Sequence, residues 1–241
     1  DCHEYERDSE SWRARGIVKW PTITLGATNN PYIDEPVRTL ASKWVGEAKS
    51  AFEGTNITFQ DYVVGGAPPD EEQRLSTTDT DDARNGTGIY GTVSFIIESG
   101  RFGWTKGRQV DLGKRVEAYH RLAWFIVKKA AGNDDARQTV EAARVSPVGD
   151  YIPVNYFWAN LGGKLKTVNA VDITTSKTVE IKSYNLMTDF VVKRSVPRPE
   201  AYAIPPSANT AAFTALLKEH AIPFETLSAE KSVTVEPARL L

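Results

Sequence analysis

The stretch that most constrains the fold runs from residue 92 to residue 100 and reads Thr-Val-Ser-Phe-Ile-Ile-Glu-Ser-Gly. It is short, apolar and rich in β-branched and aromatic residues, and Gly91 and Gly100 bracket it. These features are typical of a buried strand rather than of a helix. Glu98 would then lie at the C-terminal end of the strand, where open α/β sheets place their active sites. The alternative is an ordinary solvated carboxylate at a strand end.

The composition is that of an ordinary globular protein with one large or two modest domains. Of its 241 residues, 41% are hydrophobic and 25% are charged. The formal net charge of −2 gives no electrostatic reason to expect a nucleic acid partner. No apolar run approaches the roughly 20 residues that cross a bilayer, so we expect no membrane partner. A single cysteine, Cys2, excludes an internal disulfide framework and a cysteine-based zinc site.

The first 145 residues alternate strand and helix patterns, which predicts an α/β fold. Strand patterns fall at 21–25 and 59–64, and apolar residues at helical spacing fall at 34–53 and 111–131. A polar stretch as long as that between 65 and 88 is usually a functional loop or a disordered linker. Because it runs directly into the Glu98 strand, we expect it to be a loop that lines the substrate site.

The pattern changes after residue 146. Short strand-like runs occur at 150–158, 165–173, 178–183 and 188–194, which is the spacing of an antiparallel β-unit. A helix is then predicted from Ser207 to His220, followed by a terminal strand. We therefore expect two parts, a domain at 1–145 and a small β-rich appended region at 146–241.

The chain has three histidines, and two of them have structural explanations. His120 lies in a predicted helix, and no second metal ligand follows it at three or four residues, so it is expected to be a packing or surface residue. His220 lies in the last turn of a predicted helix, where a cation is favoured by the helix dipole. His3, in the segment Asp-Cys-His-Glu-Tyr at 1–5, has no such explanation.

That segment resembles the one that carries the third zinc ligand in zinc carboxypeptidases of the carboxypeptidase A family, where an aromatic residue follows the histidine shortly. Glu98, 95 residues later, resembles the catalytic glutamate of the same family. The helices and the long loop come in the expected order. The Arg-Pro-Glu-Ala-Tyr-Ala-Ile-Pro stretch at 198–205 is similar to the appended region of large bacterial members. The resemblance covers nearly the whole chain.

The resemblance implies the C-terminal portion of a mixed-sheet zinc-carboxypeptidase domain, with helices on the sheet. It implies a metallocarboxypeptidase that binds one zinc ion and hydrolyses the C-terminal peptide bond of a peptide or protein substrate. His3 would be a zinc ligand, and Glu98 would be the general base that activates the metal-bound water. It also implies a secreted or periplasmic location.

In that family the first two zinc ligands come from a His-x-x-Glu motif well upstream of the third. We expect that motif to be missing here, so that the chain is the C-terminal part of an enzyme and holds zinc weakly or not at all. The missing N-terminal part would then be a partner. Two alternatives are a catalytically silent fragment that acts as a structural or binding module, and a zinc-dependent deacylase of the same superfamily.

Three further residues are candidates for substrate binding. Arg84 and Asn85 precede a Gly-Thr-Gly turn and are chemically suited to hold a carboxylate. Arg84 is equally explained by a surface ion pair with Asp81 or Asp82. Tyr90 is the candidate for the family's mobile, substrate-contacting tyrosine, and Tyr62 is the alternative.

Overall fold

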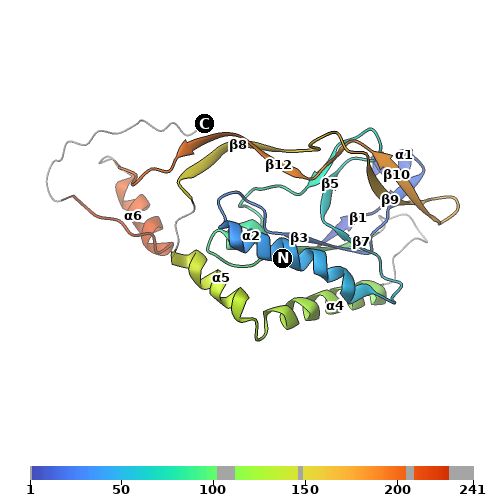
Figure 1. Ribbon diagram of the computed structural model, residues 1–241, viewed down its shortest axis with the longest axis horizontal. Coiled ribbons are helices and arrows are strands. Elements are labelled where there is room, and N and C mark those ends of the chain that lie inside the picture. The colour runs from blue at the N-terminus through green and yellow to red at the C-terminus, as the bar shows by residue number, and fades with distance from the viewer. Residues whose placement is uncertain (1, 102–111, 146–148, 205–208, 228–241) are drawn as a thin grey trace. The chain divides into compact units, whose positions relative to one another are not determined.

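The chain divides into two compact units, Asp1–Pro197 and Arg198–Leu241, which are described separately. No helix in the parts of the chain that the structure describes is long and apolar enough to cross a membrane. The computed structural model (Figure 1) describes four segments of the chain: 2–101, 112–145, 149–204 and 209–227.

A four-stranded mixed sheet forms the centre of the first unit. Its strand order is β1 (Cys2–Glu6), β7 (Phe95–Arg101), β3 (Ile23–Ala27) and β4 (Phe59–Asp61). β7 runs parallel to β1 and antiparallel to β3, and β4 runs parallel to β3. The apolar stretch that predicted a buried strand is therefore an inner strand, hydrogen-bonded on both sides.

One face of this sheet is apolar and is covered by helices. α2 (Glu35–Glu47), the 3₁₀ helix η1 (Ala48–Phe52) and α4 (Leu112–Ala130) pack there (Figure 1). The ring of Trp44 stacks on Phe95, and that of Phe52 stacks on Phe59, with centroids 6.1 and 5.3 Å apart. Other buried members of this core are Ile23, Leu25, Ile97, Ala118 and Leu122.

The α5 helix (Asp134–Val145) contacts α2 and adds the buried Ala136 to the same core. Sequence periodicity did not predict this helix. It also did not predict α3 (Ala83–Gly88) or β6 (Gln73–Leu75), both of which lie inside the expected loop at 65–88.

The described part of the first unit also contains two three-stranded sheets, a two-stranded antiparallel sheet and one short helix, α1 (Glu10–Ala14). The first sheet joins a strand from the start of the chain to two strands after residue 146, and the second joins strands β5, β6 and β11. The strands of the first sheet are β2 (Ile17–Lys19), β9 (Lys166–Asp172) and β10 (Thr178–Ser183). Those of the second that are not yet defined are β5 (Val63–Gly65) and β11 (Leu186–Met187). The two-stranded sheet consists of β8 (Tyr151–Ala159) and β12 (Asp189–Pro197), which pair antiparallel although three strands separate them in the sequence.

The boundary expected after residue 145 is not where the chain divides. β9 pairs with β2, and β11 pairs with β6, so the strands after 146 are tied into the first unit as far as Pro197. A small second core, which includes Trp12, Ile17 and Val168, spans that expected boundary. The antiparallel pairs predicted there do form, as β9 with β10 and as β8 with β12.

The second unit contains one described helix, α6 (Thr210–Glu219). Its predicted start at Ser207 and the predicted terminal strand lie outside the described residues, as does the predicted start of the 111–131 helix at residue 111.

We expect Leu25→Ala to destabilise the first unit by about 2–5 kcal/mol, because Leu25 is fully buried between the sheet and the helices. Urea unfolding followed by circular dichroism measures this loss. Val127→Ala is the control, since Val127 is an exposed residue of α4 and should change stability by less than about 0.5 kcal/mol. Equal losses in the two variants would contradict the assigned core.

Candidate functional site

Glu98 lies in the middle of β7 and not at its C-terminal end, because the strand continues to Arg101. It is directly paired with His3 on β1 and with Thr24 on β3. Paired residues on neighbouring strands project from the same face of a sheet. His3, Glu98 and Thr24 therefore share the face that points away from the helices.

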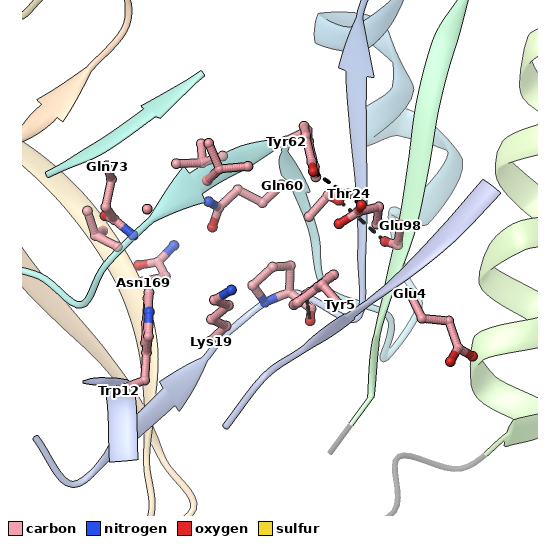
Figure 2. Close-up of a pocket in the computed structure, with 15 residues that line it drawn as sticks. Glu4, Tyr5, Trp12, Lys19, Thr24, Gln60, Tyr62, Gln73, Glu98 and Asn169 are labelled. Carbon is pink, nitrogen blue, oxygen red and sulfur yellow. Dashed lines mark hydrogen bonds between the residues drawn. The ribbon is translucent and has the colours of Figure 1, made fainter. Parts of the chain in front are cut away.

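The alternation of side chains along the strands makes this second face polar. Ile97 joins the helix-facing core, and its neighbour Glu98 projects to the opposite side. Thr24 and Gln60, paired across β3 and β4, continue the same polar face. Figure 2 shows Glu98, Thr24 and Tyr62 gathered at one end of a pocket.

Glu98 is a buried residue, 9% exposed, and its carboxylate accepts a hydrogen bond from a tyrosine. The hydroxyl of Tyr62 donates a hydrogen bond to its Oε1 at 3.1 Å, and the Thr24 hydroxyl donates to the Glu98 backbone oxygen at 3.3 Å. Burial raises the pKa of Glu98, whereas the Tyr62 hydrogen bond and the charges of His3, Lys19 and Arg84 oppose that rise.

Burial and the nearby Glu98 carboxylate raise the pKa of Tyr62 to about 12. Tyr62 therefore keeps its proton at neutral pH and remains a hydrogen-bond donor. Glu98, a proton acceptor, is thus in contact with Tyr62, a proton donor, and the pair is partly buried from water. Such paired groups with displaced pKa values are typical of acid–base sites.

A pocket of about 290 Å³ opens beside this pair, and Tyr5 and Lys19 also line it. The Lys19 ammonium lies 5.3 Å from the centre of the Tyr5 ring, a cation–π contact. Burial lowers the pKa of Lys19 and raises the pKa of Tyr5. The described lining of the pocket thus includes two carboxylates, Glu4 and Glu98, the ammonium of Lys19, and two protonated tyrosines.

The segment that carries Lys19 is fixed by hydrogen bonds from β1 and its continuation. Arg7 donates from Nε to the Lys19 oxygen at 2.8 Å and from Nη2 to the Trp20 oxygen at 2.9 Å. Tyr5 donates to the Pro21 oxygen at 2.5 Å. Gly100 leaves the space that Arg7 occupies, because a Cβ there would lie 2.7 Å from the Arg7 Cγ and Cδ atoms.

His3 is exposed and is the second residue of β1, which extends to Glu6. Its backbone oxygen accepts a hydrogen bond from Tyr119 of α4. Contrary to the expectation that the chain lacks a His-x-x-Glu motif, His3 and Glu6 have that spacing. Strand residues three apart point to opposite faces, so these two side chains cannot hold one metal ion together.

The described residues do not by themselves fit a catalytic zinc ion. They contain no cluster of three or more His, Cys, Asp or Glu side chains that could hold a metal. A catalytic zinc site needs three protein ligands and an open position. His3 is the one donor that the pairing with Glu98 places beside the proposed base.

Arg84 and Asn85, predicted to bind substrate, begin α3 and are almost completely buried. Arg84 is 1% exposed and pairs with Asp82, Nη2 to Oδ2, at 2.7 Å. The alternative ion pair with Asp82 is thus present, but it is buried instead of lying on the surface. The Asn85 side chain accepts from the backbone N–H groups of Asn29 and Asn30 at 3.0 and 3.1 Å.

Neither residue is among the described residues that line the pocket. Asn85 joins α3 to the segment after β3, and Arg84 ties it to Ser76 and Thr77, so both have structural contacts, and substrate binding by them stays a prediction. Tyr90 is 54% exposed and also lies outside that lining, whereas the alternative tyrosine, Tyr62, contacts Glu98.

Sequence reasoning missed Thr24, Gln60 and Gly26 as parts of the sheet face that carries Glu98, and it missed Lys19 of β2 as part of the pocket lining. The alternation in Thr-Ile-Thr-Leu-Gly at 22–26 is a signal that could have placed Thr24 and Gly26 on the face of Glu98. Gly26 is needed there because a Cβ would lie 2.9 Å from the Tyr62 Cβ. Lys19 has no comparable local signal.

No protein-family model, curated protein or solved structure matches this chain. The assignment of a function therefore depends on the geometry and chemistry of the pocket beside Glu98.

We expect Glu98→Gln to be more stable than the wild type at neutral pH and to lose this advantage in acid. The folded pKa of Glu98 lies above its unfolded value, so its stabilising contribution is complete below the unfolded pKa of about 4.3 and is lost as the pH rises through the folded pKa. A difference of one pKa unit corresponds to about 1.4 kcal/mol.

Urea unfolding of both proteins between pH 3.5 and 8 measures the difference. Gln60→Ala is the control, since it alters the same pocket without changing charge and should differ from the wild type by a constant amount. A Glu98→Gln difference that is flat with pH would show that the carboxylate is not strained by burial.

We expect Tyr62→Phe to raise the pKa of Glu98 further, because it removes a hydrogen bond to the ionised carboxylate. NMR titration of protein labelled with ¹³C at glutamate carboxyl carbons reports this pKa directly. Tyr90→Phe is the matched control and should leave it unchanged, since Tyr90 is exposed and outside the pocket lining. If the pKa of Glu98 were the same in Tyr62→Phe as in the wild type, the hydrogen bond from Tyr62 to Glu98 would be excluded.

Proposed function

We propose that Glu98 is the general base of a hydrolase of the zinc-carboxypeptidase type, which acts on the C-terminal peptide bond of a peptide or protein. The main support is the direct pairing of His3 with Glu98 on adjacent parallel strands. Two residues 95 positions apart in the sequence, singled out as metal ligand and base, share one face of one sheet. A secreted or periplasmic location belongs to the same proposal.

The burial and contacts of Glu98 suit this role. A general base must be ionised to take a proton from water and must have a pKa high enough to hold it briefly before passing it to the leaving amine. Burial raises the pKa of Glu98 and so helps it to hold the proton. The hydrogen bond from Tyr62 and the positive charges nearby favour the ionised form that accepts the proton.

Tyr62 has two parts in the proposed reaction. Its hydrogen bond fixes the rotamer of Glu98, so that the free carboxylate oxygen is available for a water molecule. Because it stays protonated at neutral pH, it can also donate to an oxygen that becomes negative during the reaction.

In the proposed enzyme a zinc ion would lower the pKa of the attacking water and polarise the carbonyl group. His3 is the described residue that would bind it, and further ligands would have to come from outside the described residues. The steps assigned to this chain are therefore those of Glu98 and Tyr62.

A second candidate is a binding module without catalysis. It is favoured by the finding that the described residues hold no three-ligand metal cluster. Such a module would use the same pocket to bind a peptide segment. A zinc-dependent deacylase would also use the same base, and the choice of substrate separates it from a carboxypeptidase.

We expect Glu98→Gln to lower hydrolysis by about 10²–10⁴-fold, since that is the usual contribution of a general base. The assay supplies the full chain with Zn²⁺ and measures amino acid release from N-acylated dipeptides and from N-acetylated amino acids. Preference for the second substrate class would identify a deacylase.

Asp61→Asn is the control. It removes one carboxylate from β4 of the same sheet, at the residue after Gln60 and on the opposite face from Glu98. Near-wild-type turnover by Glu98→Gln would remove Glu98 from the mechanism. Absence of hydrolysis by the wild type, together with ligand binding in the pocket, would favour the binding module.

A further inference from the structure

The end of the pocket away from Glu98 is formed by polar residues from four different elements. Trp12 comes from α1, Lys19 from β2, Gln73 from β6 and Asn169 from β9. Figure 2 shows Trp12, Asn169 and Gln73 on the side opposite Glu98 and Tyr62, with Lys19 between the two groups. This arrangement gives the pocket a second polar end.

Two buried polar atoms at this end have no hydrogen-bond partner among the described residues. They are the Nε1 of Trp12, in a residue 3% exposed, and the Oε1 of Gln73, in a residue 6% exposed. Buried polar atoms are paired in the great majority of cases, because leaving one unpaired costs its full desolvation. The Trp12 Nε1–H is a donor and the Gln73 Oε1 is an acceptor.

These two atoms differ from the other buried polar atoms that lack a hydrogen bond. The carboxylate of Glu47 pairs with Lys129, and Arg84 pairs with Asp82, so their charges are balanced. Arg101 likewise lies near Glu4. Trp12 and Gln73 have no such compensation among the described residues, and both line the pocket.

Lys19 adds a positive charge without a direct counter-ion. No carboxylate in the described part of the chain lies within 4.0 Å of its ammonium, whose neighbour is the Tyr5 ring. A half-buried ammonium with three donor protons is usually paired with an anion. Burial lowers the pKa of Lys19, and the charges of Glu98 and Glu6 oppose that fall; an anionic group bound in the pocket would oppose it further.

We infer that Trp12, Lys19, Gln73 and Asn169 form a recognition subsite for a substrate residue that carries a side-chain carboxylate next to an amide group. Lys19 and the Trp12 indole N–H donate to the carboxylate, and Gln73 Oε1 accepts from the amide N–H. A pocket of about 290 Å³ suits one such residue. The identity of the bound group as part of a substrate rests on the proposed function. The binding of an acidic residue in the pocket does not depend on that function.

The subsite gives the strands after residue 146 a direct part in recognition. Asn169 and Val168 of β9 form part of the pocket wall, because β9 is paired with β2. The region expected to be an appendage therefore selects the ligand.

The test uses N-acetyl-L-glutamate α-amide, and N-acetyl-L-glutamine amide is the neutral control of the same size. Titration of ¹⁵N-labelled protein is followed through the indole N–H signals, and the Trp12 signal is assigned with Trp12→Phe. We expect the acidic probe to shift the Trp12 indole signal and to bind at least about tenfold more tightly than the neutral one.

Lys19→Met should remove the difference between the two probes, and Lys19→Arg should retain most of it. Lys128→Met is the control for a lost lysine, since Lys128 lies on α4 and outside the pocket lining. Equal affinity of the two probes for the wild type, no binding, or an unmoved Trp12 signal would overturn the inference.

The Glu98→Gln variant separates this inference from the proposed function. It should bind the acidic probe at least as well as the wild type, because it removes a negative charge from the pocket and leaves the subsite intact. If that variant remained active while the probe binding followed expectation, the proposed base would be wrong and the subsite would stand.

Discussion

The hydrogen bonding of β7 on both sides is the constraint on which the site depends. Because β7 is paired with β1 and with β3 in fixed register, its alternating side chains must fall on two defined faces. Phe95 and Ile97 supply the helix-covered core, and Glu98 is forced to the other side. The apolar contacts of the same strand thus compensate the unfavourable burial of a carboxylate.

Local patterns in the sequence predicted much of the framework. The strand around Glu98, the helices α2 and α4 and the antiparallel strands after 146 follow from periodicity and from turn residues, which act over short distances. Glu98 was predicted at the C-terminal end of its strand, but β7 continues to Arg101. The end of the strand could not be predicted because it depends on the pairing with β1. α5 was missed although its charged ends are typical of a helix.

The pocket could not be predicted in the same way, because its contacts join distant parts of the chain. Tyr90 was chosen for its closeness to Glu98 in sequence, but Tyr62, 36 residues away, makes the contact. The change of composition at 146 marks a change from helices to strands, and it was the reason for predicting a domain boundary there. The pairings of β2 with β9 and of β6 with β11 tie the two parts together.

That pairing has a consequence for how such a protein can diversify. The proposed base is built into the central sheet, where a substitution disturbs the main core, whereas Asn169 stands on a different sheet with its own small core. Substitutions in β9 can change the wall of the pocket without altering the strand that carries Glu98. If the proposed base is correct, the residue that carries the reaction and a residue of the recognition wall stand on different sheets, so ligand preference can change while Glu98 stays in place.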